Sequence, residues 1–124
     1  MRRFYTMILA CLMGGTACTQ SPAKFISQNN IDFAGTVADT AVQIVDVRTP
    51  AEFASGHIPN AVNVDVNGIN FDKQISALDK KRPVAVYCRS GARSKHAARK
   101  LSRMGFKVYE LDRGVMNWNG EIVK

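Results

Sequence analysis

An apolar run at residues 83–87 leads into a short polar segment and then into a helix-forming pattern. Residues 92–104 carry apolar side chains at positions 97, 98, 101 and 104, which form one face of a helix, and Gly105 follows as a stop signal. A buried strand, a loop and an amphipathic helix in that order are typical of a parallel α/β sheet. The pattern therefore predicts an open sheet with its functional loops at the carboxyl ends of the strands.

The same alternation of strand and helix continues on both sides of this unit. Apolar runs of strand length occupy residues 43–47, 61–66 and 106–111. Between the first two runs, Thr49 and Pro50 are a helix-start signal, because threonine caps a helix and proline suits its first position. Gly56 ends that short helix. A second helix is predicted over residues 69–78, and a short last element around Val115, Met116 and Trp118. The strands should form a parallel sheet with helices on both faces.

The chain begins with two basic residues and an apolar segment, a pattern that is typical of an export signal. Arg2 and Arg3 precede a charge-free run of 14 residues at positions 4–17, which is shorter than the roughly 20 residues that a membrane-crossing helix needs. We therefore predict a signal peptide over residues 1–17, a polar tether over residues 18–23 and one folded domain over residues 24–124. A length of 124 residues suits a single domain.

Small residues lead into a cysteine at the end of this segment. Gly15-Thr16-Ala17-Cys18 resembles the lipobox of bacterial lipoproteins, although an aliphatic residue usually stands where this chain has Gly15. The resemblance implies that Cys18 is lipidated and that the protein is a membrane-anchored lipoprotein of the periplasm or cell envelope. Conventional cleavage of the signal and a retained anchor are the alternatives. A lipidated Cys18 would leave Cys88 as the one free thiol after cleavage, with no disulfide partner.

The candidate catalytic and binding residues lie in the loop between the strand at 83–87 and the following helix. Its residues are Cys88, Arg89, Ser90, Gly91, Ala92, Arg93 and Ser94. Successive N–H groups in such a loop form an anion-binding nest, and the next helix adds its N-terminal partial positive charge. A thiol flanked by Arg89 and Arg93 should have a pKa below the free value of about 8.5. We predict a Cys88 thiolate nucleophile, against the alternative of a buried structural cysteine.

These segments together resemble the rhodanese family of sulfurtransferases. Residues 88–94 match its active-site loop, and the upstream matches are Asp46-Val47-Arg48, Glu52-Phe53 and residues 56–63. Gly114 and Trp118 match the closing segment. Asn60 stands where glycine is usual, a position at which asparagine also tolerates a left-handed turn. Arg113 stands where a second glycine is common.

The resemblance implies a rhodanese-like α/β fold with a central parallel sheet of about five strands and helices on both faces. It also implies that Cys88 takes the outer sulfur of thiosulfate or a persulfide and passes it to a thiol or cyanide acceptor. Arg89 and Arg93 would bind the anionic donor, unless Arg93 pairs with Asp46 and orients the loop. No metal and no organic cofactor are expected, because the intermediate is a covalent cysteine persulfide.

Four further residues are expected to support the loop rather than to react. We predict that Asp46, Arg48 and Glu52 form a structural network, because a thiolate needs no separate base; acid–base catalysis is the alternative. His57 is predicted to be a hydrogen-bonded core residue, with a catalytic role as the alternative.

Two other functions compete with a sulfurtransferase. One is a rhodanese-like binding module or persulfide carrier with weak turnover. The other is a phosphatase, because dual-specificity phosphatases resemble this fold. Four residues separate Cys88 from Arg93, as in sulfurtransferases, whereas those phosphatases have five and a wider cradle.

The basic charge of the chain is concentrated around the loop. Residues 80–113 contain eleven basic and two acidic residues, net +9, whereas residues 18–79 contain three basic and seven acidic residues, net −4. Lys95, Arg99 and Arg103 follow one another at four-residue spacing on one helix face. No groove-reading motif accompanies these charges, so nucleic acid is not an expected partner. We interpret the excess as a local positive field that attracts a small sulfur anion.

Overall fold

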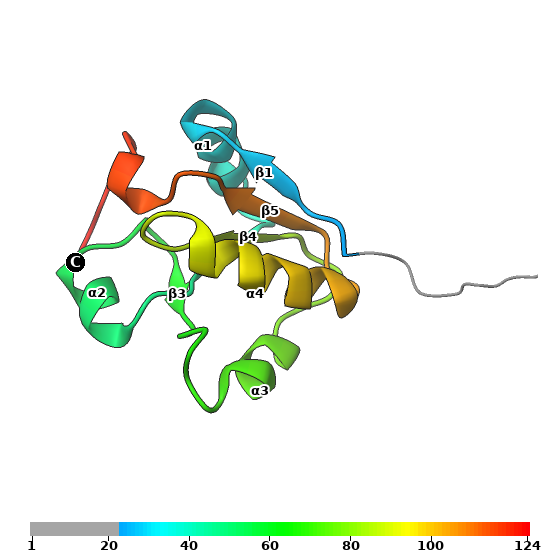
Figure 1. Ribbon diagram of the computed structural model, residues 1–124. Coiled ribbons are helices and arrows are strands. Elements are labelled where there is room, and N and C mark those ends of the chain that lie inside the picture. Colours follow the sequence, from blue (N-terminus) through cyan, green and yellow to red (C-terminus); the bar gives the residue numbers. More distant parts are fainter. Residues whose placement is uncertain (1–22) are drawn as a thin grey trace, which may run out of the picture.

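Five short parallel strands form one sheet in the order β1-β5-β4-β2-β3 (Figure 1). The computed structural model describes residues 23–124, so the predicted signal peptide and most of the tether, residues 1–22, lie outside the described residues. The strands are β1 (Ile26–Gln28), β2 (Gln43–Asp46), β3 (Val62–Asn63), β4 (Val84–Tyr87) and β5 (Val108–Leu111). Strand β4 lies at the centre, so the loop that follows it leaves the middle of the sheet.

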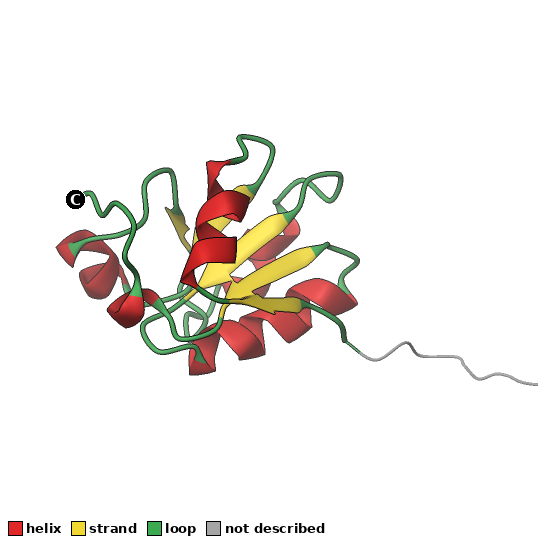
Figure 2. Cartoon of the chain, turned by 90° about the horizontal axis from the view of Figure 1, so that it is seen from above, coloured by secondary structure: helices red, strands yellow, loops and turns green. Residues whose placement is uncertain are grey.

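Helices cover both faces of this sheet (Figure 2). They are α1 (Asn30–Ala38), α2 (Pro50–Ser55), α3 (Phe71–Ser76) and α4 (Ala92–Arg103), followed by the 3₁₀ turn η3 (Val115–Asn117). One apolar core joins the sheet to α3 and α4, and the other joins it to α1 and the segment around Trp118. The predicted α/β fold with a five-stranded parallel sheet is confirmed.

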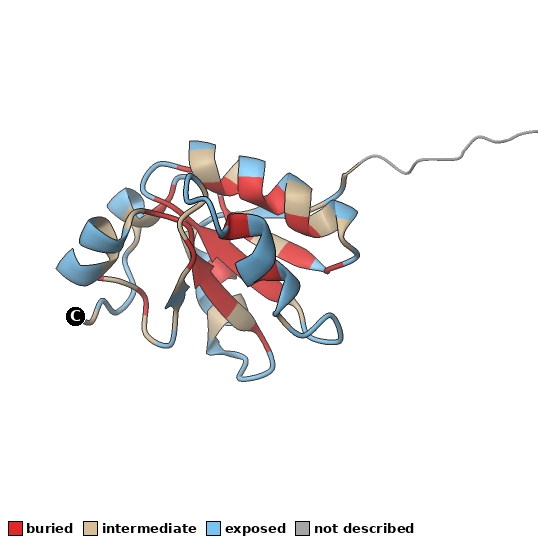
Figure 3. Ribbon diagram, turned by 90° about the horizontal axis from the view of Figure 1, so that it is seen from below, coloured by how far each residue is buried: buried red, intermediate tan, exposed pale blue. Residues whose placement is uncertain are grey.

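The central strands are buried on both faces, whereas the outer helix surfaces are exposed (Figure 3). Alternation along β4 produces this burial, because successive side chains point to opposite faces. Val84 and Val86 contribute to the core under α4, and Ala85 and Tyr87 to the core under α1. Cys88 continues the alternation and therefore lies on the α4 face.

The helix that follows β2 begins as the sequence predicts. The Thr49 hydroxyl accepts a hydrogen bond from the Glu52 N–H, and the Glu52 carboxylate accepts one from the Thr49 N–H. This reciprocal pair satisfies two N–H groups that would otherwise lack partners at the start of α2. Asn60 adopts the expected left-handed conformation, with φ 69°.

The structure differs from the sequence prediction at the edges of the sheet. Strand β1 and helix α1 occupy residues for which no element is predicted from the sequence, because β1 is a three-residue edge strand and only Phe33 of α1 is fully buried. The predicted strand at 61–66 is regular only over Val62–Asn63. The next residues still hydrogen-bond beside β2, since the Val64 N–H donates to Asp46 O at 2.9 Å.

No helix among residues 23–124 combines the length and the apolar character required to cross a membrane.

Candidate active site

The loop after β4 wraps backbone N–H groups around the sulfur of Cys88. The N–H of Gly91 lies 3.1 Å from Cys88 Sγ, and the N–H of Ser94 lies 3.3 Å from it. The Ser94 hydroxyl is 3.5 Å from the same sulfur. Cys88 is fully buried, while Arg89 and Ser90 are exposed. The loop therefore surrounds a buried sulfur with donors and has an exposed rim.

Hydrogen bonds to the sulfur lower the pKa of Cys88. Burial by itself would raise the pKa of the thiol, since it disfavours the charged form. The contact with the Ser94 hydroxyl and the hydrogen bonds from the N–H groups of Ser94, Gly91 and Ser90 outweigh that effect and leave the pKa below its ordinary value. The loop itself, rather than the predicted Arg89 and Arg93, provides the main stabilisation of the thiolate.

Two glycines make this path possible. Gly91, at φ 106°, caps α4 in a left-handed conformation, and a Cβ there would lie 2.0 Å from Asp112 O. Gly114, at φ 71°, packs against the other side of the loop, where a Cβ would lie 2.2 Å from Arg89 O. Neither position has room for a side chain. The segment after β5 thus packs closely against the loop and restricts its conformation. It is also hydrogen-bonded to the loop, since the Val115 N–H donates to Cys88 O at 2.9 Å.

Arg93 is anchored to helix α2 rather than free for a ligand. Its guanidinium forms two hydrogen bonds to Glu52, of 2.8 and 3.0 Å. The Arg93 ion pair and the capping bonds of Thr49 lower the pKa of Glu52 to about 2. The alternative in which Arg93 pairs with Asp46 is wrong. The Arg93 guanidinium forms its ion pair with Glu52, and Asp46 forms one with Arg48.

A buried ion pair holds the loop that follows β2. The Arg48 guanidinium binds the Asp46 carboxylate at 2.6 Å and donates to Gly56 O at 2.7 Å. The Asn63 amide donates to Asp46 O and Arg48 O, which ties β3 to the same loop. Asp46 and Arg48 are thus buried and paired with each other, an arrangement that fixes the loop rather than exposing either group to a ligand.

A buried carboxylate that the sequence analysis did not identify lies behind Ser94. Glu110 of β5 is fully buried, and its carboxylate accepts a hydrogen bond of 2.6 Å from the Ser94 hydroxyl. The signal was present in the sequence, because Val108 and Glu110 share one face of a predicted strand, and an acid there faces the core. The same carboxylate lies 3.3 Å from Lys95 Nζ.

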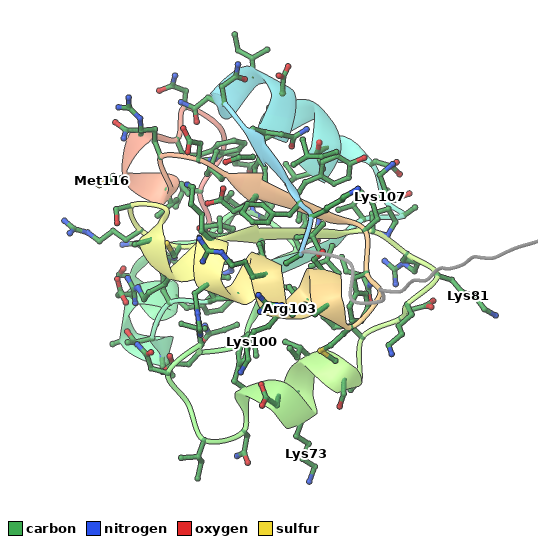
Figure 4. All side chains as sticks on the ribbon, turned by 45° about the vertical axis from the view of Figure 1, so that its right-hand side comes forward. Lys73, Lys81, Lys100, Arg103, Lys107 and Met116 are labelled. Atoms are coloured by element: carbon green, nitrogen blue, oxygen red, sulfur yellow. The ribbon has the colours of Figure 1, made fainter. Side chains whose placement is uncertain are left out.

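The basic residues around the loop differ in how far they are neutralised. Lys95 forms ion pairs with Glu110 and with Asp112, whose Oδ1 lies 2.8 Å from Lys95 Nζ. Within residues 23–124, Arg89 has no carboxylate within 4 Å. Lys73 and Lys81 point outward on distant parts of the surface (Figure 4). The positive field at the loop rim is therefore smaller than the charge count suggests, and Arg89 contributes to it.

His57 packs beside α2. Its ring stacks on Phe53 with centroids 3.7 Å apart, and its Nδ1 lies 3.0 Å from Phe53 O. Within the described chain, no cluster of three or more His, Cys, Asp or Glu side chains is arranged to hold a metal ion.

Comparison with known proteins identifies relatives of this fold and site. The family model for the rhodanese-like domain matches residues 31–121. A sulfurtransferase of Allochromatium vinosum is 43% identical over 84 residues, which are 66% of this chain and 77% of that protein. The thiosulfate sulfurtransferase GlpE of Shewanella oneidensis is 41% identical over 80 residues, 64% of this chain and 77% of that protein. The crystal structure of a rhodanese-related protein from Thermoplasma volcanium superposes with a TM-score of 0.72 at 26% identity, covering 80% of this chain and 98% of that one.

The Glu52–Arg93 pair predicts a pH-dependent loss of stability in Glu52→Gln. A carboxyl whose pKa is lowered from 4.5 to about 2 stabilises the fold fully above pH 4.5, and the contribution falls as the pH drops towards 2. Since both partners are partly exposed, we expect a loss of about 1–2 kcal/mol at neutral pH. Denaturant unfolding of both proteins at several pH values measures it.

The matched control is Asp72→Asn, which removes an exposed ion pair with Lys100. We expect this change to alter the free energy of unfolding by less than about 0.5 kcal/mol. Equal losses in the two variants at neutral pH, or a Glu52→Gln loss that persists at pH 2, would contradict the role assigned to Glu52.

Proposed function

The chain belongs to the rhodanese family, and we propose that it is a sulfurtransferase that carries sulfane sulfur on Cys88. The donor would be thiosulfate or a persulfide, and the acceptor a thiol or cyanide. The observation that carries this proposal is the ring of N–H donors around a single buried sulfur, which suits a sulfur anion.

In the first half of the proposed reaction, the Cys88 thiolate attacks the outer sulfur of the donor. A bond forms between Sγ and that sulfur while the donor's own S–S bond breaks, and sulfite leaves with the bonding electron pair when the donor is thiosulfate. The product is a cysteine persulfide whose terminal sulfur carries the negative charge. The N–H groups of the loop would stabilise that charge without rearranging.

In the second half, an acceptor nucleophile attacks the terminal sulfur of the persulfide. The S–S bond to Cys88 breaks, Sγ recovers the electron pair, and the acceptor leaves as thiocyanate or as a new persulfide. The low pKa of Cys88 makes its thiolate a good leaving group at this step. The reaction as proposed uses no metal or organic cofactor.

Arg89 is the residue that we propose binds the anionic donor. It is exposed at the rim of the loop, whereas Arg93 is held by Glu52. A guanidinium suits the sulfonate oxygens of thiosulfate, because its N–H groups form charge-assisted hydrogen bonds. Donor recognition thus would rest on one arginine and the loop N–H groups.

We also propose that the protein is exported and anchored by lipid at Cys18. The support is the sequence of residues 1–18 alone: two arginines, a short apolar run and small residues before a cysteine. The folded domain, which contains the sulfur site, would then be held in the cell envelope by the short tether of residues 18–23.

Cys88→Ser is expected to abolish sulfur transfer. Wild-type protein incubated with thiosulfate should gain the mass of one sulfur atom on the peptide that contains Cys88, and should form thiocyanate when cyanide is added. The variant should do neither, because a serine hydroxyl is not ionised under these conditions. Cys18→Ser, a cysteine change outside the loop that remains in the chain after the predicted cleavage, should retain both properties.

Two results would change the proposed function. A mass gain without thiocyanate would identify a persulfide carrier. No mass gain in the wild type, with thiosulfate or with a persulfide donor, would favour a binding module, and release of phosphate from an aryl phosphate would favour a phosphatase.

Arg89→Ala is expected to raise the KM for thiosulfate about tenfold, because one charge-assisted hydrogen bond to the donor is lost. The titration of the Cys88 thiol should change little, since Arg89 is not among the groups that hydrogen-bond the sulfur. Arg99→Ala is the matched control on the exposed face of α4 and should leave KM unchanged. Equal KM values in the wild type and Arg89→Ala would remove Arg89 from the donor site.

Cys18→Ala tests the anchor. Cells that express the wild type should incorporate a labelled lipid precursor into the protein and retain it in the membrane fraction, and the variant should lose both properties. The control is Cys11→Ala, which changes the other cysteine among residues 1–18 and should keep both the labelling and the membrane retention. Labelling that persists in Cys18→Ala would show that lipid is attached elsewhere.

A further inference from the structure

Glu110 is a charged side chain in the core, next to the reactive loop. It lies on the same face of the sheet as Cys88, under α4, and has no exposed surface. A buried carboxylate is stable only when its oxygens receive hydrogen bonds. Here the Ser27 hydroxyl donates to Oε1 at 2.6 Å, and the Ser94 hydroxyl to Oε2 at 2.6 Å.

The hydroxyl of Ser94 connects this carboxylate to the sulfur. A serine hydroxyl has one proton to donate and lone pairs to accept. Two acceptors lie near it, Gly91 O at 3.1 Å and Glu110 Oε2 at 2.6 Å, and the shorter contact takes the proton. The Ser94 oxygen then faces Cys88 as an acceptor, and the thiol donates to it at 3.5 Å. In this arrangement Ser94 cannot also donate to a thiolate.

Negative charge on Cys88 and on Glu110 at the same time is unfavourable. The two hydrogen bonds in series place Sγ and Oε2 no more than about 6 Å apart, and both groups are buried. Like charges at that separation in a poorly solvated site raise each other's affinity for a proton. The pair therefore favours one negative charge, with Ser94 as the path for the proton between them.

We propose that Glu110 is a positioning residue that acts through Ser94 and stores the proton of Cys88 between the two halves of sulfur transfer. This inference rests on the proposed function. As the S–H bond breaks, its proton passes to Ser94 Oγ while the Ser94 hydroxyl proton passes to Glu110 Oε2. The negative charge moves from the carboxylate to the sulfur, and no electrons are gained or lost overall. The proton returns by the same path when the acceptor removes the sulfane sulfur.

The other charged groups around this pair come from each element packed against it. Lys95 of α4 lies 3.3 Å from Glu110 and closer to Asp112, at the end of β5. Arg93, at the start of α4, interacts electrostatically with Cys88 while bound to Glu52. Strand β1 contributes the neutral Ser27. None of these groups bridges Cys88 and Glu110 as Ser94 does.

Glu110→Gln tests the proposal, because glutamine keeps the size and hydrogen bonding of the side chain but holds neither the charge nor the proton. The thiolate absorbance of Cys88 is titrated against pH in the full chain carrying Cys11→Ser and Cys18→Ser, with Cys88→Ser as the baseline for each variant. Without the neighbouring charge, the midpoint should fall by about one pH unit or more. We expect the wild-type curve to be broad, because two interacting groups share it, and the Glu110→Gln curve to be a single-step titration.

Asp112→Asn is the matched control. It removes an acidic group that shares Lys95 with Glu110 but is exposed and does not contact Ser94. Its midpoint should not fall. A Glu110→Gln curve identical to the wild type, or shifted to higher pH, would overturn the proposal, since the carboxylate would then be structural or would favour the thiolate.

Ser27→Ala provides a second test that leaves the core intact, because Ser27 lies on the exposed edge strand. Loss of its hydrogen bond removes one of the donors that stabilise the buried carboxylate of Glu110. The Cys88 midpoint should fall by less than in Glu110→Gln, and an unchanged midpoint would count against the proposal. These titrations need no sulfur donor, so a failure of sulfur transfer is distinguishable from a failure of this inference.

Discussion

The hydrogen bonds from the loop backbone to Cys88 Sγ are the interaction on which the site depends. Together with the contact to the Ser94 hydroxyl they outweigh burial, which alone would raise the pKa of the thiol. They exist only because the chain turns sharply at Gly91 and because Gly114 lets the segment after β5 approach the loop. The strands that carry both segments, β4 and β5, are neighbours in the sheet. The order of the strands and two glycines thus determine the chemistry of one sulfur.

Three carboxylates secure the surroundings of the loop, each with a different partner. Asp46 holds Arg48 beneath α2, Glu52 holds Arg93 at the start of α4, and Glu110 holds Ser94 from the side of β5. The first two bind cations and fix parts of the backbone. Glu110 differs because it contacts a hydroxyl that also contacts the sulfur. This difference is why, of the three, only Glu110 is assigned a part in moving a proton.

Features set by local sequence were predictable, and features set by contacts across the sheet were not. The cap at Thr49, the helix after Gly91 and the sharp turn at Asn60 follow from neighbouring residues and have the predicted form. The partner of Arg93 could not be predicted from neighbouring residues, because Glu52 is 41 residues away and its position depends on how α2 packs. Strand β1 was missed for the same reason, since three half-exposed residues form a strand only because β5 lies beside them.

Net charge is a poor guide to the field at a site until its pairing is known. The segment around the loop carries a large basic excess in sequence, yet Arg93 and Lys95 are neutralised by acids from α2, from β5 and from the residue that follows it. Glu110 and Asp112, the two acids within that segment, both lie against Lys95 on the side of β5. Within residues 23–124, the site thus carries Arg89 at its exposed rim without a carboxylate within 4 Å, whereas Arg93 and Lys95 are paired. Under the proposed function, a small donor that releases a dianion such as sulfite would suit this arrangement, because the leaving charge would face Arg89 and solvent while the persulfide charge would stay on the loop N–H groups.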